Sequence, residues 1–310
     1  MRSIRFLFLI TALHCFIGII SCSAEHKPKQ DLLDSGFRPT SFWDSMKWKR
    51  EDSGTDFREN DDVKTAEKNF SHFCETIQKS PKPNYEISPT NSSIPPIIHF
   101  IWLGSPLTAQ AERAIASWKK YHPSWKTEVW TDERVRDFPW TKERLYKLFQ
   151  EAGTWAEKAD ILRLDILYQF GGIYSDVDVI CLRSFHDLVI QDITFFSCFE
   201  LNYTSRHYGA PFFVGTAVMG SSKGSAVIKY CLDHCQSESE APRAGILKRT
   251  GPGLVSRACQ NHFVNPEEKI LILPCSYLYP FPWMSRKEAP EEFIAPESFA
   301  IHLWNYSWES

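Results

Sequence analysis

The sequence predicts an α/β fold built around a mostly parallel sheet. From residue 94 onward, short apolar runs alternate with longer segments of helical periodicity, which is typical of strands joined by helices. Hydrophobic residues make up 43% of the 310-residue chain and aromatic residues 14%, which is enough for a sizeable core and excludes wholesale disorder. The 35 Lys and Arg against 38 Asp and Glu give a net charge of -3. Without a basic excess, the composition argues against a protein that holds nucleic acid through phosphate contacts.

The N-terminal segment, residues 1–22, has the pattern of a targeting or anchoring signal. Arg2 and Arg5 precede an apolar run over residues 6–20, which is shorter than the ~20 residues that a transmembrane helix needs. Three interpretations are open: a cleaved secretory signal, a bacterial lipoprotein cleavage box ending in Cys22, and a retained type II anchor of the Golgi kind. Each predicts membrane association or passage through the N-terminus, in a bacterial envelope or in the secretory pathway.

Two further regions follow the signal. Residues 23–93 are polar and mixed in charge, which predicts a stalk with peripheral helices, one of them over residues 63–78. Pro81, Pro83 and Pro89 close this stretch. Residues 94–310 form the predicted compact domain, and their length favours one domain over two.

The order of elements within residues 94–310 follows from the apolar runs and from the residues that end them. The continuous apolar run over 97–102 predicts a buried first strand. Pro123 ends the first helix, and Gly171-Gly172 ends the third. Later strands are expected over 127–130, 173–175, 193–199, 216–219, 270–273 and 299–303, and helices over 109–121, 142–151, 156–170, 225–236 and 254–262. Ligands bind such sheets at the carboxyl ends of the strands.

An acidic pair follows the predicted strand over 173–175. Asp176 and Asp178 are one residue apart, and an extended backbone would point both carboxylates to the same side. Two carboxylates that close repel each other unless a cation lies between them, and hard oxygen ligands suit Mg²⁺ or Mn²⁺. A cation held there would stabilise the charge of a departing diphosphate. A lone Asp-x-Asp is more often a solvated turn than a metal site, so the neighbouring sequence must distinguish the two.

That context is the helix and the glycine pair directly before it. Asp160 and Arg163 are three residues apart on one helix face, which fits either a surface ion pair of well under ~1 kcal/mol or a fork for a sugar and its phosphate. In the fork, Asp160 accepts hydrogen bonds from sugar hydroxyls while Arg163 donates. Gly171 and Gly172 would let the backbone approach a ligand as it turns into the acidic strand.

These segments resemble a known family. The stretch AEKADILRLDILYQFGGIYSDVDVI, with IPPIIHFIWLG before it and AIHLWNYSW after it, is similar to the glycosyltransferases whose sugar-binding region contains a DxD motif. The family includes fungal initiating α-1,6-mannosyltransferases, inositolphosphoceramide mannosyltransferases and α-1,4-galactosyltransferases. The similarity covers residues 94–308. It implies a GT-A-type, Rossmann-like fold, a nucleotide-sugar donor, a divalent metal and retention of the anomeric configuration.

The resemblance also assigns roles to the acidic block. It implies that Asp160 and Arg163 bind the donor sugar and its phosphate. Asp176 is expected to contact the ribose or the metal's water shell, and Asp178 to ligate the metal directly. Asp160, Arg163 and Asp178 are the residues expected to carry catalysis.

Three more residues are assigned to donor binding by their places in the motifs. Trp102 matches the position where relatives place an aromatic side chain near the nucleotide base, although a core tryptophan would explain it equally well. Gly172 and Tyr174 belong to the block that leads into the acidic pair.

The C-terminal motif offers a third metal ligand. His302 is the first choice beside the carboxylates, with Asn305 and Ser307 as alternatives. The turn Thr250-Gly251-Pro252 matches a late family motif that is expected to shape the acceptor side, although a tight turn alone would explain it.

The function predicted from these features is a metal-dependent retaining glycosyltransferase. It would use Mn²⁺ or Mg²⁺ and transfer a hexose from GDP-mannose or a UDP-hexose, with mannose favoured, to a glycan, glycolipid or protein. Two alternatives are open. A haloacid-dehalogenase-like phosphatase would use Asp176 and Asp178 but needs a later acidic pair, and a non-catalytic lipoprotein would bind a sugar or a metal ion.

Overall fold

The computed structural model describes residues 39–46, 58–79, 92–189, 191–200 and 212–305. The predicted signal over residues 1–22 lies outside these ranges, so its three interpretations stay predictions. Within the described residues, no helix combines the length and the apolar character that crossing a membrane requires.

The centre of the molecule is a sheet of six strands in the order β2-β1-β3-β6-β5-β7. β1 pairs in parallel with both β2 and β3, β5 pairs in parallel with β7, and only β6 runs against its neighbours. The predicted α/β class with a mostly parallel sheet is therefore confirmed. The strands are β1 (Ile97–Ile101), β2 (Lys126–Trp130), β3 (Gly172–Ser175), β5 (Phe195–Cys198), β6 (Val218–Ser221) and β7 (Ile270–Leu273).

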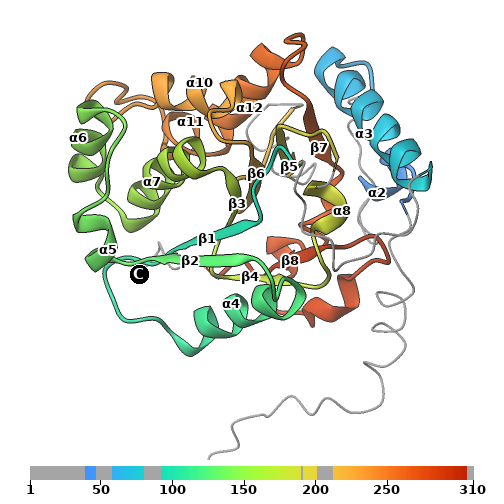
Figure 1. The fold of residues 1–310 in the computed structure, drawn as a ribbon, viewed down its shortest axis with the longest axis horizontal. Coiled ribbons are helices and arrows are strands. Elements are labelled where there is room, and N and C mark those ends of the chain that lie inside the picture. The colour runs from blue at the N-terminus through green and yellow to red at the C-terminus, as the bar shows by residue number, and fades with distance from the viewer. Residues whose placement is uncertain (1–38, 47–57, 80–91, 190, 201–211, 306–310) are drawn as a thin grey trace, which may run out of the picture.

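Helices cover both sides of this sheet (Figure 1). Helices α7 (Trp155–Phe170), α10 (Ala226–His234) and α12 (Pro252–His262) lie together on one side. Helix α4 lies on the other side, beside β4. The helices of the domain are α4 (Ala109–Tyr121), α5 (Asp132–Arg136), α6 (Glu143–Glu151), α7 (Trp155–Phe170), α8 (His186–Val189), α10 (Ala226–His234), α11 (Ile246–Arg249) and α12 (Pro252–His262), and three short 3-10 turns span Cys275–Tyr277, Trp283–Ser285 and Pro290–Phe293.

Helix α7 is the element that positions the site. The Thr154 hydroxyl caps its first turn by accepting from the Glu157 N–H, and Gly171 ends it with φ +63°, where a side chain would be strained. Residues 160–167 are all buried, because α7 is packed between the sheet and helices α6 and α10. A helix enclosed on all sides need not show a polar stripe, so charged residues on it require buried partners.

A second, two-stranded sheet stands apart from the first. β4 (Val179–Cys181) pairs antiparallel with β8 (Ala300–His302), and Val179 lies opposite His302. The strand expected over 299–303 is present, but β4 was not predicted. β6 begins two residues later than expected. The Thr216 carbonyl accepts from Arg163, and the Ala217 carbonyl accepts from the Asp176 N–H just past the end of β3.

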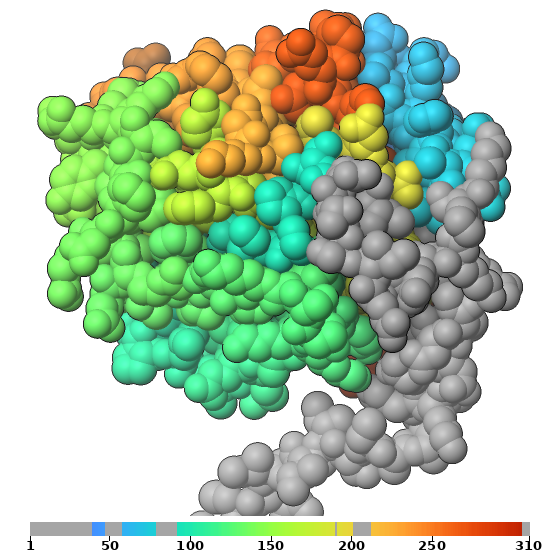
Figure 2. Space-filling model, viewed as in Figure 1, coloured from blue at the N-terminus to red at the C-terminus, as the bar shows by residue number. Residues whose placement is uncertain are grey.

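The region predicted as a stalk with peripheral helices contributes two helices to the domain. α2 (Phe42–Ser45) and α3 (Asp61–Lys79) are described, and α3 packs against β7. The Phe70 ring contacts Tyr277 edge to face with centroids 5.4 Å apart, and its side chain belongs to the same hydrophobic core as the sheet. In the space-filling view, the blue surface of α3 adjoins the yellow and orange surface of later elements (Figure 2).

Candidate active site

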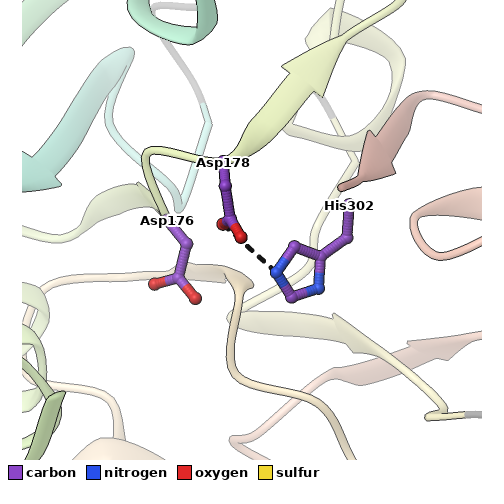
Figure 3. Close-up of side chains that lie close together, drawn as sticks. All are labelled: Asp176, Asp178 and His302. Carbon is purple, nitrogen blue, oxygen red and sulfur yellow. Dashed lines mark ion pairs between the residues drawn. The ribbon is translucent and has the colours of Figure 1, made fainter. Parts of the chain in front are cut away.

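The acidic pair lies in the turn between β3 and β4, not on an extended strand. The Val179 N–H donates to the Asp176 carbonyl at 3.3 Å, and the Asp176 N–H donates to the Ala217 carbonyl at 2.8 Å. The expectation that an extended backbone aligns the two carboxylates is therefore wrong. They converge because the turn folds Asp178 back beside Asp176 (Figure 3).

His302 completes a cluster with the two carboxylates. One ligand atom from each of Asp176, Asp178 and His302 lies within 4.8 Å of the others. The Nε2 atom of His302 is 3.2 Å from Asp178 Oδ1, the contact drawn in Figure 3. The pairing of β4 with β8 brings these residues together across 124 positions of sequence. The Asn305 N–H donates to Asp178 Oδ2 at 2.9 Å, so Asn305 supports the carboxylate through its backbone.

The charges in the cluster act on one another. Burial alone would raise the pKa of Asp178, but the positive charge and hydrogen bond of His302 hold it below its usual range. Burial would lower the pKa of His302, and the charge of Asp178 outweighs it, so the histidine pKa is raised. Burial and the neighbouring charge of Asp178 raise the pKa of Asp176, and Arg163 opposes them. The cluster therefore stabilises positive charge between its members.

Tyr174 links the acidic cluster to Arg163. Its hydroxyl donates to Asp176 Oδ1 at 2.6 Å, and the Arg163 guanidinium lies over its ring, 4.8 Å from the centroid. Arg163 Nη1 is 3.6 Å from the same Asp176 oxygen. Tyr174 is 2% exposed, so it acts by orienting Asp176 and Arg163 and has little surface for a ligand.

Asp160 and Arg163 form a buried ion pair. Their side chains are 10% and 6% exposed, so the interpretation as a helix-surface pair is wrong. Arg163 Nη2 contacts Asp160 Oδ1, while Arg163 Nη1 donates to the Thr216 carbonyl at 2.7 Å. The Thr250 hydroxyl donates to Asp160 Oδ2 at 2.9 Å. Each charge is thus paired and hydrogen-bonded, as burial requires.

Trp102 follows β1 at the carboxyl edge of the sheet. It is partly exposed, lies outside the described hydrophobic core, and its indole N–H donates to the Ser105 carbonyl at 2.8 Å. The alternative of a core tryptophan is therefore not supported. β1 and β3 are parallel neighbours, so their following residues Trp102 and Asp176 lie at the same edge.

Gly172 lies at the other end of β3. Its φ is +95°, and a Cβ there would be 2.5 Å from the Ile97 carbonyl oxygen. The close approach that this glycine allows within the protein is therefore to β1. Its assignment to donor binding stays a prediction. The other predicted alternative ligand, Ser307, lies outside the described residues.

The sequence analysis did not predict that Trp304 contacts His302 or that Thr250 contacts Asp160. Trp304 has φ +53°, which is rare for a bulky residue, and its ring centroid is 4.0 Å from that of His302. Its indole N–H donates to the Phe281 carbonyl at 2.6 Å. Both residues stand inside motifs that the sequence displays, but a motif does not reveal which distant side chain its members contact.

The residues present fit a hard divalent cation. Two carboxylates and an imidazole are suitable ligands for Mn²⁺ or Mg²⁺, and Nδ1 of His302 is buried without a hydrogen-bond partner while Nε2 faces the carboxylates. The seven cysteines in the described part of the chain are free, and none belongs to this cluster.

Comparison with known proteins identifies the region that carries this site. Residues 108–195 match the family model described as a glycosyltransferase sugar-binding region containing the DXD motif. An uncharacterized glycosyltransferase of Acanthamoeba polyphaga mimivirus is 26% identical over 227 residues, covering 69% of this chain and 84% of that protein.

Two enzymes of Schizosaccharomyces pombe are also similar. Inositol phosphoceramide mannosyltransferase 3 is 35% identical over 108 residues, 34% of this chain and 30% of that enzyme. Inositol phosphoceramide mannosyltransferase 1 is 28% identical over 225 residues, 69% of this chain and 62% of that enzyme. The chain thus spans less than two thirds of either yeast enzyme.

Among solved structures, a glycosyltransferase titled PaToxG is 20% identical with a TM-score of 0.44, covering 65% of this chain and 79% of that one.

The segment 108–195 that matches the family model contains α7, β3, the acidic turn and β4, which hold Asp160, Arg163, Asp176 and Asp178. Residues 108–195 are therefore similar to the sugar-binding region, with its DXD motif, of the glycosyltransferases.

Proposed function

We propose that the protein is a metal-dependent retaining hexosyltransferase that uses a nucleotide-sugar donor. The observation that carries the proposal is the cluster of Asp176, Asp178 and His302, whose ligand atoms lie within 4.8 Å of one another. It lies beside a buried Asp160–Arg163 pair on the helix that precedes the acidic turn. A cation site next to a carboxylate–guanidinium pair suits a sugar joined to a diphosphate.

Asp176, Asp178 and His302 would hold the cation. When bound, Mn²⁺ or Mg²⁺ would supply Lewis-acid stabilisation of the departing nucleoside diphosphate. Arg163 donates toward phosphate or sugar oxygens, and Asp160 accepts from a sugar hydroxyl. Trp102, partly exposed at the same sheet edge, offers its indole face to the nucleotide base.

Retention of configuration is proposed to occur by attack on the same face. A double displacement needs a free carboxylate nucleophile. The three carboxylates of this site are already engaged: Asp160 by Arg163 and Thr250, Asp176 by Tyr174, and Asp178 by His302. We therefore assign the acceptor hydroxyl as the attacking group, with the leaving phosphate taking its proton.

Mannose is the favoured sugar and a glycolipid the favoured acceptor. Both yeast relatives are named as inositol phosphoceramide mannosyltransferases, so their names point to a sugar nucleotide of mannose and a sphingolipid-type acceptor. Galactose and glucose are the alternative sugars, and a comparison of donors distinguishes them from mannose. Glycans and proteins are the alternative acceptors. Association with a membrane, through residues 1–22 or through the acceptor, belongs to the same proposal.

The decisive experiment replaces one proposed metal ligand. Asp178→Asn is expected to reduce transfer more than about a hundredfold and to abolish Mn²⁺-dependent nucleotide binding. Mutation of a residue that only hydrogen-bonds to a metal ligand already lowers metal affinity or activity by about 10- to 100-fold. Activity is measured with Mn²⁺ or Mg²⁺ against GDP-mannose, UDP-galactose and UDP-glucose. Asp192→Asn is the matched control, because its carboxylate is 72% exposed and pairs only with Lys269 in the described structure.

Circular dichroism and thermal unfolding of both variants would establish that the fold survives. Wild-type transfer by a folded Asp178→Asn variant would refute the metal assignment.

A further inference from the structure

The segment that joins α11 to α12 reaches the buried face of α7 and contacts two acidic residues there. Arg249 Nη2 donates to Glu157 Oε1 at 2.7 Å, and the Thr250 hydroxyl donates to Asp160 Oδ2 at 2.9 Å. Glu157 and Asp160 are three residues apart, so both lie on the same side of α7. All four residues are at most 7% exposed. Two adjacent residues therefore attach a distant turn to the helix that bears the sugar-binding pair.

The contact with Thr250 completes the restraint of the Asp160 carboxylate. Oδ1 contacts Arg163, and Oδ2 accepts from Thr250. Rotation of an aspartate about its last torsion is soft, because that torsion has broad minima. With only the Arg163 contact, the carboxylate could rotate out of its plane, whereas hydrogen bonds to both oxygens fix it.

The surroundings of the hydroxyl favour this contact. Thr250 Oγ1 is also 3.2 Å from the Ile246 carbonyl, but hydrogen bonds to a charged acceptor are the stronger ones. The Gly251 backbone lies against the same oxygen, since a Cβ there would be 3.4 Å from Asp160 Oδ2. A carboxylate oxygen accepts more than one hydrogen bond, so a sugar hydroxyl can be received without displacing Thr250.

We propose that Thr250 is a positioning residue for the donor sugar, acting through Asp160. The inference rests on the proposed function, in which Asp160 accepts a hydrogen bond from the sugar. It assigns the Thr250-Gly251-Pro252 turn to the donor side of the site. The turn had been expected to shape the acceptor side. Thr250 then affects binding of the sugar moiety. It does not affect binding of the nucleoside diphosphate, which the cation cluster and Trp102 would hold.

The test compares ligands that differ only in the sugar. Thr250→Val removes the hydroxyl and keeps the shape, and Thr250→Ser restores the hydroxyl. With Mn²⁺ present, Thr250→Val is expected to weaken GDP-mannose binding about tenfold, about 1.4 kcal/mol, and to leave GDP binding within about twofold of wild type. Thr250→Ser should bind both ligands as wild type does. UDP-galactose with UDP serves as the second ligand pair if the donor panel selects it.

Thr194→Val is the matched control. The Thr194 hydroxyl donates to Glu268 Oε2 at 2.7 Å, so this variant also loses a threonine–carboxylate hydrogen bond, but at the start of β5 and not at α7. It should lower thermal stability as Thr250→Val does and leave discrimination between GDP-mannose and GDP unchanged. If Thr250→Val does not fold, Thr250→Ala removes the same hydroxyl with less steric demand and is measured in its place.

The possible outcomes separate this inference from the function on which it rests. If wild-type protein binds no nucleotide sugar in a metal-dependent way, the proposed function fails. If wild type binds but the hydroxyl-free variant keeps wild-type affinity for GDP-mannose, or loses GDP and GDP-mannose equally, only the role of Thr250 is overturned. Steady-state kinetics add a second readout: KM for the donor should rise more than kcat falls, with rescue by serine.

Discussion

Tyr174 connects the negative and positive groups of the active site. Its hydroxyl holds Asp176 at 2.6 Å, and its ring lies under the Arg163 guanidinium. The residue is buried, so its hydroxyl needs the carboxylate as a partner as much as the carboxylate needs the hydroxyl. This mutual dependence explains why a tyrosine stands in the buried strand β3.

A variant at Tyr174 would measure this support. Tyr174→Phe keeps the ring under Arg163 but leaves Asp176 without its donor, so Mn²⁺ affinity is expected to fall about tenfold or more. Titration of free Mn²⁺ by electron paramagnetic resonance is the measurement. Tyr277→Phe, which removes a buried hydroxyl beside α2 and α3, should leave Mn²⁺ affinity unchanged. Unaltered Mn²⁺ binding by Tyr174→Phe would show that Asp176 needs no such support.

At the scale of elements, the junction of α7 and β3 sets the position of the acidic turn. Gly171 ends the helix with φ +63°, and Gly172 begins the strand with φ +95°. The strand can lie against β1 only because Gly172 carries no Cβ, which would be 2.5 Å from the Ile97 carbonyl oxygen. His99 Nε2 donates to the Gly171 carbonyl at 2.9 Å and fixes the junction from the β1 side.

Substitution of Gly172 tests the importance of this close approach. Gly172→Ala should lower the free energy of unfolding by about 3 kcal/mol or more, since left-handed strain of about 1–2 kcal/mol adds to a backbone clash. Gly224→Ala is the control, because its φ is also positive, +73°, but nothing lies within 4 Å of the added Cβ. That variant should lose only the strain. Urea unfolding measures both, and equal losses would mean that the contact with Ile97 is unimportant.

On the scale of the whole molecule, two buried neutral histidines make stability depend on pH. His99 Nδ1 accepts from the Trp130 indole N–H at 3.2 Å, and His122 Nε2 accepts from the Phe185 N–H at 2.8 Å. Protonating either nitrogen would place two donors against each other. Burial lowers the pKa of His99 and of His122 to about 4. Both rings therefore stay neutral in the folded protein under conditions where the unfolded chain binds protons.

The direction of the pH dependence follows from these pKa values. An unfolded histidine titrates near 6.5, so the free energy of unfolding should fall as pH drops from about 6.5 to 4, by about 3 kcal/mol for each histidine. The raised pKa of His302 acts in the opposite sense, and mainly above pH 6.5. Urea unfolding between pH 6.5 and 4.5 measures the slope, and His122→Gln should reduce it. A flat profile in that window would contradict neutral burial.

The sequence allowed much of the fold to be predicted, because local signals fix where elements begin and end. The bounds of α4 and β7 were predicted to the residue, as Pro123 lies just past α4 and β7 is a pure apolar run. The short strand β4 was missed, because three residues beside an acidic turn carry no period of their own. Its strand character comes from pairing with β8, more than a hundred residues later.

For the candidate site, the residue types were evident from the sequence but their partners were not. The resemblance pointed to Asp160, Arg163, Asp176, Asp178 and His302. The cluster of Asp176, Asp178 and His302 lies together, and Asp160 pairs with Arg163. Sequence alone took the Asp160–Arg163 pair as exposed or sugar-bound, and Gly172 as facing a ligand. The structure shows that the Asp160–Arg163 pair is buried and that Gly172 lies against the Ile97 carbonyl, and no local pattern encodes either contact.

By itself the sequence determined the alternation of strands and helices, the resemblance to a sugar-binding region and the chemical types gathered in its motifs, because periodicity, caps and motif spacing are properties of neighbouring residues. Only the tertiary structure decided that a turn bends Asp178 toward Asp176, that β8 delivers His302 to them, and that Thr250 restrains Asp160. The contacts of His302 and Thr250 join segments 124 and 90 residues apart. They depend on how buried surfaces pack across the whole chain, and that information is distributed over residues far from the site.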